Sequence, residues 1–179
     1  MKHVMLDLET MGTRPGSMIL SIGAVFFDLD GKTGETFYRN IDPQTCTAVG
    51  LTVDPQTKAW WMRQSQAARD ALAVDRRPLA HVVRDFASFF RGSGFCRGEF
   101  VWAQGATFDP PLWEAAAAAV GCSTPWKFWN ARDTRTVYDI CGFDYKSMPR
   151  EGVYHNALDD CLTQVKAVAA ALSKFRVAA

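Results

Sequence analysis

Four acidic residues and one histidine stand in settings that suit a site for divalent cations. In chain order they are Asp7, Glu9, Asp109, His155 and Asp160. Carboxylate oxygens are the ligands that hard cations such as Mg²⁺ and Mn²⁺ prefer, and a pair of such ions can activate water for hydrolysis. A histidine with an ordinary pKa of about 6.5 can accept a proton near neutral pH. The residue types therefore predict metal-assisted hydrolysis, provided that folding gathers them.

The first two acids end the short apolar segment HVMLDLE, which we predict to be a buried strand from about His3 to Leu8. Side chains alternate along a strand, so Asp7 and Glu9 share one face. Two neighbouring carboxylates remain ionised together only beside cations or in water. A strand that runs out into solvent is the alternative, but the turn sequence TMG that follows at once favours a site.

The other three residues stand near predicted helix starts. Asp109 follows a strand, next to a proline, where an aspartate is also a common helix cap. His155 and Asp160 are five positions apart, which places them on different sides of a helix. Because Asn156 is a good N-cap, His155 belongs to the preceding loop and Asp160 to the helix, with Asp159 serving helix structure. An exposed loop histidine is the alternative for His155.

Other candidates are weaker. Trp60 and Trp61 could stack on a base, although such pairs more often belong to a core, and Phe108 is assigned to the core. Four cations could contact phosphate, and each is more often a solvated charge: Arg132, Arg135, Lys146 and Arg150. His3 and His81 are assigned to structure. Zinc hydrolases, phosphate-loop enzymes and dinucleotide-binding enzymes are excluded, because the chain lacks their motifs.

The surrounding sequence predicts the elements that must position these residues. Strands are predicted over residues 3–8, 18–29, 35–42, 98–105 and 127–132, with the third antiparallel to the second. Helices are predicted over residues 56–74 (one broken or two short), 78–92, 108–121, 133–142 and 156–175, with a mobile loop over residues 143–154. Three early strands followed by alternating helix and strand predict an α/β fold, a mixed central β-sheet flanked by helices. We expect one domain over residues 1–179.

Composition agrees with such a domain. Hydrophobic residues make up 48% and charged residues 22% of the chain, enough for a sizeable core. The net charge of +1 excludes a broad basic surface, so any nucleic acid must be bound locally. Five scattered cysteines without a CxxC pair predict free thiols in a reducing compartment, hence a cytoplasmic protein. The acidic start predicts no signal peptide, and no apolar stretch is long enough for a membrane span.

Three motifs resemble the DEDD exonucleases, the superfamily of polymerase proofreading exonucleases, in its histidine-bearing DEDDh branch. The motif D-x-E-T begins at Asp7, the second motif ends at Asp109, and H-x-A-x-x-D runs from His155 to Asp160. The blocks GSMILSIGAVFFD, GLTVDPQTKAWWMRQS and ARDTRTVYD resemble a narrower group of small bacterial and phage 3′-5′ exonucleases, some described as exoribonucleases. In one departure, Gln104-Gly105 stands where the family often has His-Asn.

The resemblance implies a ribonuclease-H-like fold and release of 3′-terminal nucleotides as monophosphates from DNA or RNA. It implies two Mg²⁺ or Mn²⁺ ions on the four carboxylates, with His155 as general base. Weaker candidates for substrate contact are Thr10, Met11, Trp61, Phe108 and Arg132. The expected partners are nucleic-acid 3′ ends and no membrane, with a homodimer left open. The alternatives are a catalytically silent nucleic-acid-binding module and an endonuclease or integrase on the same fold.

Overall fold

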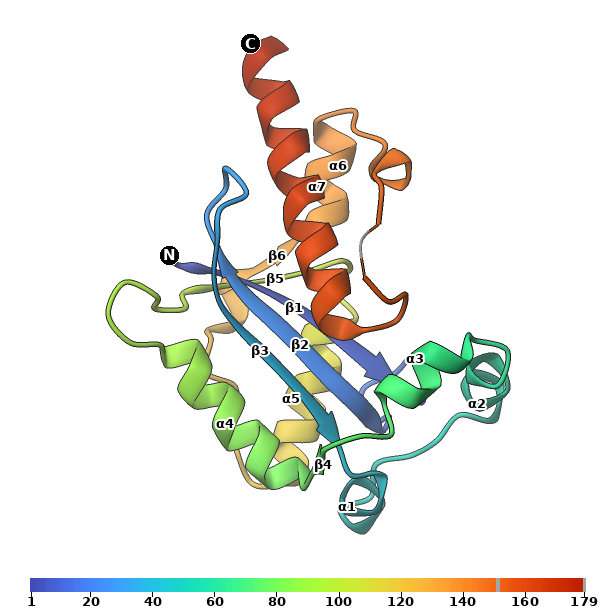
Figure 1. The fold of residues 1–179 in the computed structure, drawn as a ribbon. Helices are drawn as coiled ribbons and strands as arrows, with labels where there is room; N and C mark the ends of the chain where they lie inside the picture. Colours follow the sequence, from blue (N-terminus) through green and yellow to red (C-terminus); the bar gives the residue numbers. More distant parts are fainter. Residues whose placement is uncertain (151, 179) are drawn as a thin grey trace.

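A six-stranded mixed sheet lies at the centre of the protein in a computed structural model, which describes residues 1–150 and 152–178 (Figure 1). The strands are β1 (His3–Thr10), β2 (Ile19–Phe27), β3 (Thr33–Ile41), β4 (Arg76–Arg77), β5 (Phe100–Ala103) and β6 (Ala131–Asp133). Their order across the sheet is β4-β3-β2-β1-β5-β6. β2 runs antiparallel to β1 and β3, whereas β5 runs parallel to β1. The predicted α/β fold with a mixed central sheet is confirmed.

The helices are α1 (Pro43–Ala48), α2 (Pro55–Trp61), α3 (Gln66–Ala71), α4 (Leu79–Arg91), α5 (Asp109–Ala119), α6 (Thr134–Ile140) and α7 (Ala157–Ala178). The predicted broken helix is resolved into α2 and α3. Sequence analysis missed α1, although Asp42 caps it just as Asp54 caps α2, by accepting from the N–H two residues on. It also missed the two-residue β4. The predicted strand 127–132 divides into a 3₁₀ turn, Phe128–Asn130, and β6.

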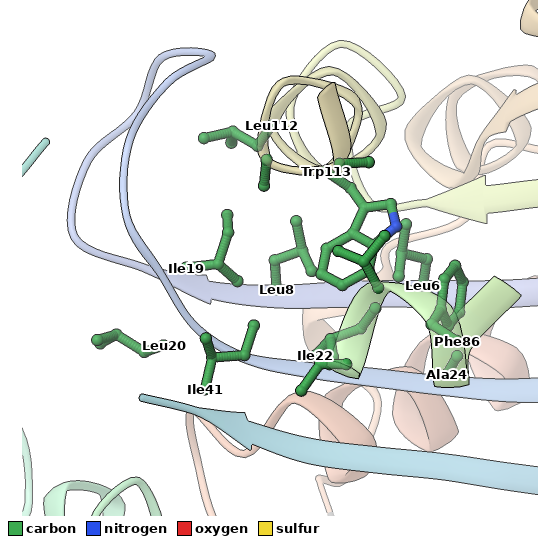
Figure 2. Packing of buried hydrophobic residues seen from close by; sticks show 14 of the residues in the cluster. Leu6, Leu8, Ile19, Leu20, Ile22, Ala24, Ile41, Phe86, Leu112 and Trp113 are labelled. Carbon is green, nitrogen blue, oxygen red and sulfur yellow. The ribbon is translucent and has the colours of Figure 1, made fainter. Parts of the chain in front are cut away.

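Apolar side chains fill both faces of the sheet. On one face, Leu6 and Leu8 of β1 pack with Phe86 of α4 and Trp113 of α5 (Figure 2). On the other face, Met5 belongs to a second buried cluster formed with α6 and α7. Full burial of one such side chain contributes roughly 1.5–3 kcal/mol. The alternation along β1 therefore holds this strand firmly between two helical layers (Figure 1).

The start of α7 lies almost in contact with the backbone of β2. A Cβ atom added at Gly23 would come within 2.2 Å of the carbonyl carbon of Ala157. The Sγ of Cys161 lies 3.3 Å from the carbonyl oxygen of Gly23 and donates to it. Since Gly23 is the register partner of Asp7, the first turn of α7 is held directly over the acidic end of β1.

All five cysteines are free thiols, as predicted. Cys46 and Cys161 are buried, and the other three are partly exposed. Among the helices of residues 1–150 and 152–178, none has both the length and the apolar character of a membrane span.

Candidate active site

The structure brings Glu9, His155 and Asp160 together, and Asp7 and Asp109 lie close enough for their charges to act on the carboxyl groups of this acidic cluster. One ligand atom each of Glu9, His155 and Asp160 lies within 4.8 Å of the other two. Asp7 belongs to the same cluster, because the charges of Asp109, Glu9 and Asp160 all act on its carboxyl group. The side chains come from β1, the start of α5, the loop before α7 and α7 itself. Segments 150 residues apart in the chain therefore share one site.

The carboxyl groups of this cluster hold protons unusually strongly. Burial, followed by the neighbouring acidic charges, raises the pKa of Asp7 well above its ordinary value, although the residue keeps some exposed surface. Burial and the charges of Asp160 and Asp109 raise the pKa of Glu9 to about 8. Burial raises the pKa of Asp109 to about 7. Oxygen donors that repel one another in this way match a divalent cation, whose charge would let them all ionise.

Asp109 is held by the sheet and does not cap its own helix. Its Oδ1 accepts from the backbone N–H of Leu8 at 3.1 Å, and the N-cap position of α5 is occupied by Phe108 rather than by Asp109. The loop before it is fixed by Asp133, whose Oδ2 accepts from the N–H of Ala106 at 2.7 Å. The simple capping alternative for Asp109 therefore does not describe its carboxylate.

Asp7 is oriented by a residue that sequence analysis missed. The Nε2 of Gln164 donates to Oδ1 of Asp7 at 2.8 Å. Gln164 is buried, lies one turn after Asp160 on α7, and its Oε1 has no hydrogen-bond partner within the described residues. A signal was present in the sequence, since Gln164 interrupts the apolar face of α7 between Cys161 and Val165.

The backbone holds His155 outside α7, as predicted. Oδ1 of Asn156 accepts from the N–H of Leu158 at 3.1 Å and so caps the helix. His155 takes a left-handed conformation with φ of 62°, which is uncommon for a residue with a side chain and often marks a functional position. Asp159 is structural, because its Oδ2 accepts from the N–H of Val153 at 2.8 Å and closes the loop.

The imidazole of His155 packs against an aromatic wall. Its centroid lies 4.8 Å from that of Trp60, at an interplanar angle of 79°. Burial lowers the pKa of His155, and the charge of Asp160 opposes this shift. A neutral imidazole beside carboxylates is suited to accept a proton. The alternative of a freely exposed loop histidine does not hold, because the ring is half-buried.

A cleft of about 520 Å³ opens beside Glu9, and we call it the Trp60 cleft. Its lining includes Glu9, Thr10, Trp60, Trp61, Arg63 and Phe108. Trp61 is only 4% exposed and its Nε1 donates to the carbonyl oxygen of Thr10 at 2.8 Å. Trp60 is 36% exposed. Of the two tryptophans, Trp60 offers the exposed ring, and Trp61 fixes the end of β1.

Two of the weaker candidates for substrate contact, Met11 and Arg132, make other interactions in the structure. The N–H of Met11 donates to the carbonyl of Met18 at 2.8 Å, and its side chain packs on the apolar cluster. The guanidinium of Arg132 lies 4.7 Å from the ring centroid of Phe100 and donates to the carbonyl of Trp129. The structure therefore does not bring Arg132 to the carboxylates, because this residue of β6 directs its guanidinium over Phe100, the first residue of β5.

A different arginine reaches the acidic cluster. Nη2 of Arg150 lies 3.1 Å from Oδ1 of Asp160, and its guanidinium lies 4.3 Å from the ring centroid of Tyr154. Beside this ion pair is a second cleft of about 240 Å³, which we call the Gln164 cleft. Its lining includes Gln104, Tyr145, Lys146, Arg150, Tyr154 and Gln164.

Residues 2–172 match the family described as the 3′-5′ exoribonuclease Rv2179c-like domain. The chain belongs to this family. It is thus a 3′-5′ exonuclease, and the predicted resemblance to DEDDh exonucleases is confirmed. The exodeoxyribonuclease of Enterobacteria phage T4 is 23% identical over 202 aligned residues, which cover 89% of this chain and 84% of that protein.

Solved structures of exonucleases share the fold. Exonuclease X in complex with 5′ overhanging duplex DNA matches with a TM-score of 0.59 and 19% identity, covering 96% of this chain and 91% of that one. Exonuclease I of E. coli in complex with a dA16 oligonucleotide matches with a TM-score of 0.66 and 15% identity, covering 98% and 42%. Exonuclease I of E. coli has also been solved with a bound zinc ion. These likenesses confirm the predicted ribonuclease-H-like fold.

Proposed function

We propose that this exonuclease releases nucleoside 5′-monophosphates from nucleic-acid 3′ ends with two Mg²⁺ or Mn²⁺ ions held by Asp7, Glu9, Asp109 and Asp160. The observation that carries the proposal is the grouping of Glu9 and Asp160 with His155, together with the mutual repulsion and burial that raise the pKa values of Asp7 and Glu9. Two such cations would supply the positive charge that neutralises the attacked phosphate and stabilises the leaving oxygen. Because both apolar clusters share one sheet, we also propose that residues 1–179 act as one exonuclease domain.

The protein groups around the carboxylates fix them before substrate arrives. The amide of Gln164 orients Asp7, and the N–H of Leu8 orients Asp109. Such partners of metal ligands commonly affect metal affinity or activity by about 10–100-fold. We infer that β1 and α7 preorganise the carboxylate ligands, so that metal ions can bind with little rearrangement of the protein.

His155 is the proposed general base. Its lowered pKa leaves the imidazole neutral at pH 7, ready to take a proton from the attacking water. The adjacent Asp160 would then stabilise the imidazolium that forms. Trp60 packs edge-on against the ring and limits its orientation.

The Trp60 cleft is the proposed site of the 3′-terminal nucleotide. The exposed ring of Trp60 offers a surface for stacking with a base, and such stacking tolerates any base. Thr10, whose carbonyl is held by Trp61, lies beside Glu9 in the same cleft. Phe108 lines the cleft as well, so its predicted place in the core and its candidate role in binding are compatible.

The names of the relatives divide between the two kinds of nucleic acid, since the family description says exoribonuclease and the phage protein is called an exodeoxyribonuclease. Matched RNA and DNA oligomers, each with single-stranded and blunt ends, should therefore be digested side by side. The ratio of kcat/KM for the RNA oligomer to that for the DNA oligomer shows which substrate the enzyme prefers. A requirement for the 2′-hydroxyl would identify an exoribonuclease.

A direct test follows the products of a 5′-labelled linear strand and of a circular strand. We expect stepwise shortening with mononucleotide release from the linear strand in Mg²⁺, none in EDTA, and no cleavage of the circle. Cleavage of the circle would support the endonuclease alternative. A purified, folded protein that releases no mononucleotide with either Mg²⁺ or Mn²⁺ would support the silent binding module and end the proposal.

A further inference from the structure

Two clefts with different lining residues lie beside the carboxylate cluster. The Trp60 cleft includes Glu9 and Thr10 at the end of β1. The Gln164 cleft includes Gln164, which binds Asp7, and Arg150, which pairs with Asp160. The two clefts have no lining residue in common. The acidic cluster therefore adjoins two separate concave surfaces.

A polymer cleaved one nucleotide from its 3′ end needs both surfaces. The terminal nucleotide lies on one side of the scissile phosphate and the remaining strand lies on the other. If the Trp60 cleft receives the terminal nucleotide, as the proposed function requires, the strand must leave on a different side of the cluster. The Gln164 cleft is a hollow at such a position.

The chemistry of the Gln164 cleft suits a sugar-phosphate unit. Arg150 presents a planar guanidinium whose side chain is 29% exposed, and guanidinium groups match phosphate oxygens well. Lys146 lines the same cleft and takes part in none of the ion pairs recorded for residues 1–150 and 152–178. The volume of about 240 Å³ is below the roughly 300–1,000 Å³ of common ligand sites, so it fits a phosphate with its sugar.

We propose that the Gln164 cleft binds the nucleotide immediately 5′ of the scissile bond, with Lys146 and Arg150 contacting its phosphate. This inference rests on the proposed function. In the structure, Arg150 supplies the positive charge beside Asp160. Once Asp160 serves as a metal ligand, that guanidinium is free to turn toward the strand. Gln104 lines the same cleft and would contact the same unit.

The test compares two substrates that differ only beyond the scissile phosphate. One is a short oligonucleotide, and the other is the p-nitrophenyl ester of a nucleoside 5′-monophosphate, which has the terminal nucleotide but no upstream one. We expect Lys146→Ala and Arg150→Ala each to lower the oligonucleotide-to-ester ratio of kcat/KM about 10- to 100-fold. Arg84→Ala, which removes an equal charge from the exposed face of α4, should keep the wild-type ratio.

A modified strand gives a second measurement that does not depend on Arg150 alone. Replacing the next phosphate upstream by an uncharged methylphosphonate should raise KM for the wild type about tenfold or more, and should raise it much less for Lys146→Ala. A wild-type ratio in both variants, or an equal loss on both substrates in both, would overturn the inference while leaving the proposed function standing. Failure of the wild type to cleave either substrate in Mg²⁺ or Mn²⁺ would overturn both.

Discussion

The carboxylates and the histidine of the site are held by different kinds of structure. Asp7 and Glu9 lie on a strand packed between two helical layers, and Asp160 lies on a helix in contact with the sheet. His155 and Arg150 lie in a polar segment, and His155 has a left-handed backbone. The difference fits the proposed roles, since the proposed metal ligands need fixed geometry, whereas the proposed base and the proposed phosphate-contacting cation must adapt to each incoming nucleotide.

The largest expected effect on activity comes from the carboxylates on the buried strand. Asp7→Asn should reduce nucleotide release to background, because the proposed carboxylate ligand becomes a neutral amide. The same change removes a charge that burial and three neighbouring acids make unfavourable, so the metal-free variant should unfold at least as high in temperature as the wild type at pH 8. Activity assays and thermal melts measure the two effects. A variant that is inactive because it is unfolded would contradict this separation of function from stability.

The second effect concerns the loop. His155→Ala should lower kcat about 10²–10⁴-fold, the usual contribution of a general base, while Mg²⁺ binding measured by calorimetry stays close to wild type. Because burial lowers the pKa of His155 from 6.5 in the substrate-free protein, the acid limb of the wild-type kcat/KM profile should lie below pH 6.5. Rate is lost as pH falls through that pKa, because the protonated ring cannot accept a proton. An unchanged kcat in the variant would remove His155 from the mechanism.

The variant Gln164→Leu tests whether the hydrogen bond from Gln164 orients Asp7 on its strand. Without its donor, Asp7 should be less well oriented, and the Mg²⁺ concentration for half-maximal activity should rise about 10–100-fold. Direct metal titration of the substrate-free protein should show the same shift, and Gln164→Asn should recover part of it. Ser173→Ala on the exposed end of α7 is the matched control. Equal metal affinity in Gln164→Leu and wild type would show that the hydrogen bond has no role in orientation.

The smallest effect is on the pH dependence of stability without metal. Glu9 has a folded pKa of about 8 against 4.5 in the unfolded chain, and Asp109 about 7 against 3.8. The folded state therefore binds more protons, and its stability should fall as pH rises from about 4 to 8. Mg²⁺ should restore stability at pH 8 by binding the ionised carboxylates. Urea midpoints across this range, with Glu9→Gln as control, measure the slope, which should be smaller in the control.

The local part of this structure could be predicted from the sequence. The caps at Asp54 and Asn156 were predictable because a cap depends on neighbours within three residues. The buried strand with Asp7 and Glu9 follows from its apolar pattern. Gathering of the five site residues was expected from the motifs, whose order and spacing resemble a known family.

The supporting contacts could not be predicted in the same way. The Gln164–Asp7 hydrogen bond joins positions 157 residues apart. The placement of Arg150 beside Asp160, and of Arg132 over Phe100, likewise depends on tertiary packing. Contacts between distant positions leave no periodic signal in the sequence. A single polar residue in an apolar helix face does not identify its partner, because such a residue can have many causes. The helix α1 is different, since its capping signal was present and was overlooked.

The close approach at Gly23 has a consequence for how this enzyme can move. Where backbone faces backbone, no rotation of a side chain can make room, so the first turn of the last helix and the central strands cannot shear past one another. Opening and closing around a passing strand must then occur in the flanking segments. The flanking segments are therefore the part of the protein in which substrate preference can change without disturbing the carboxylates.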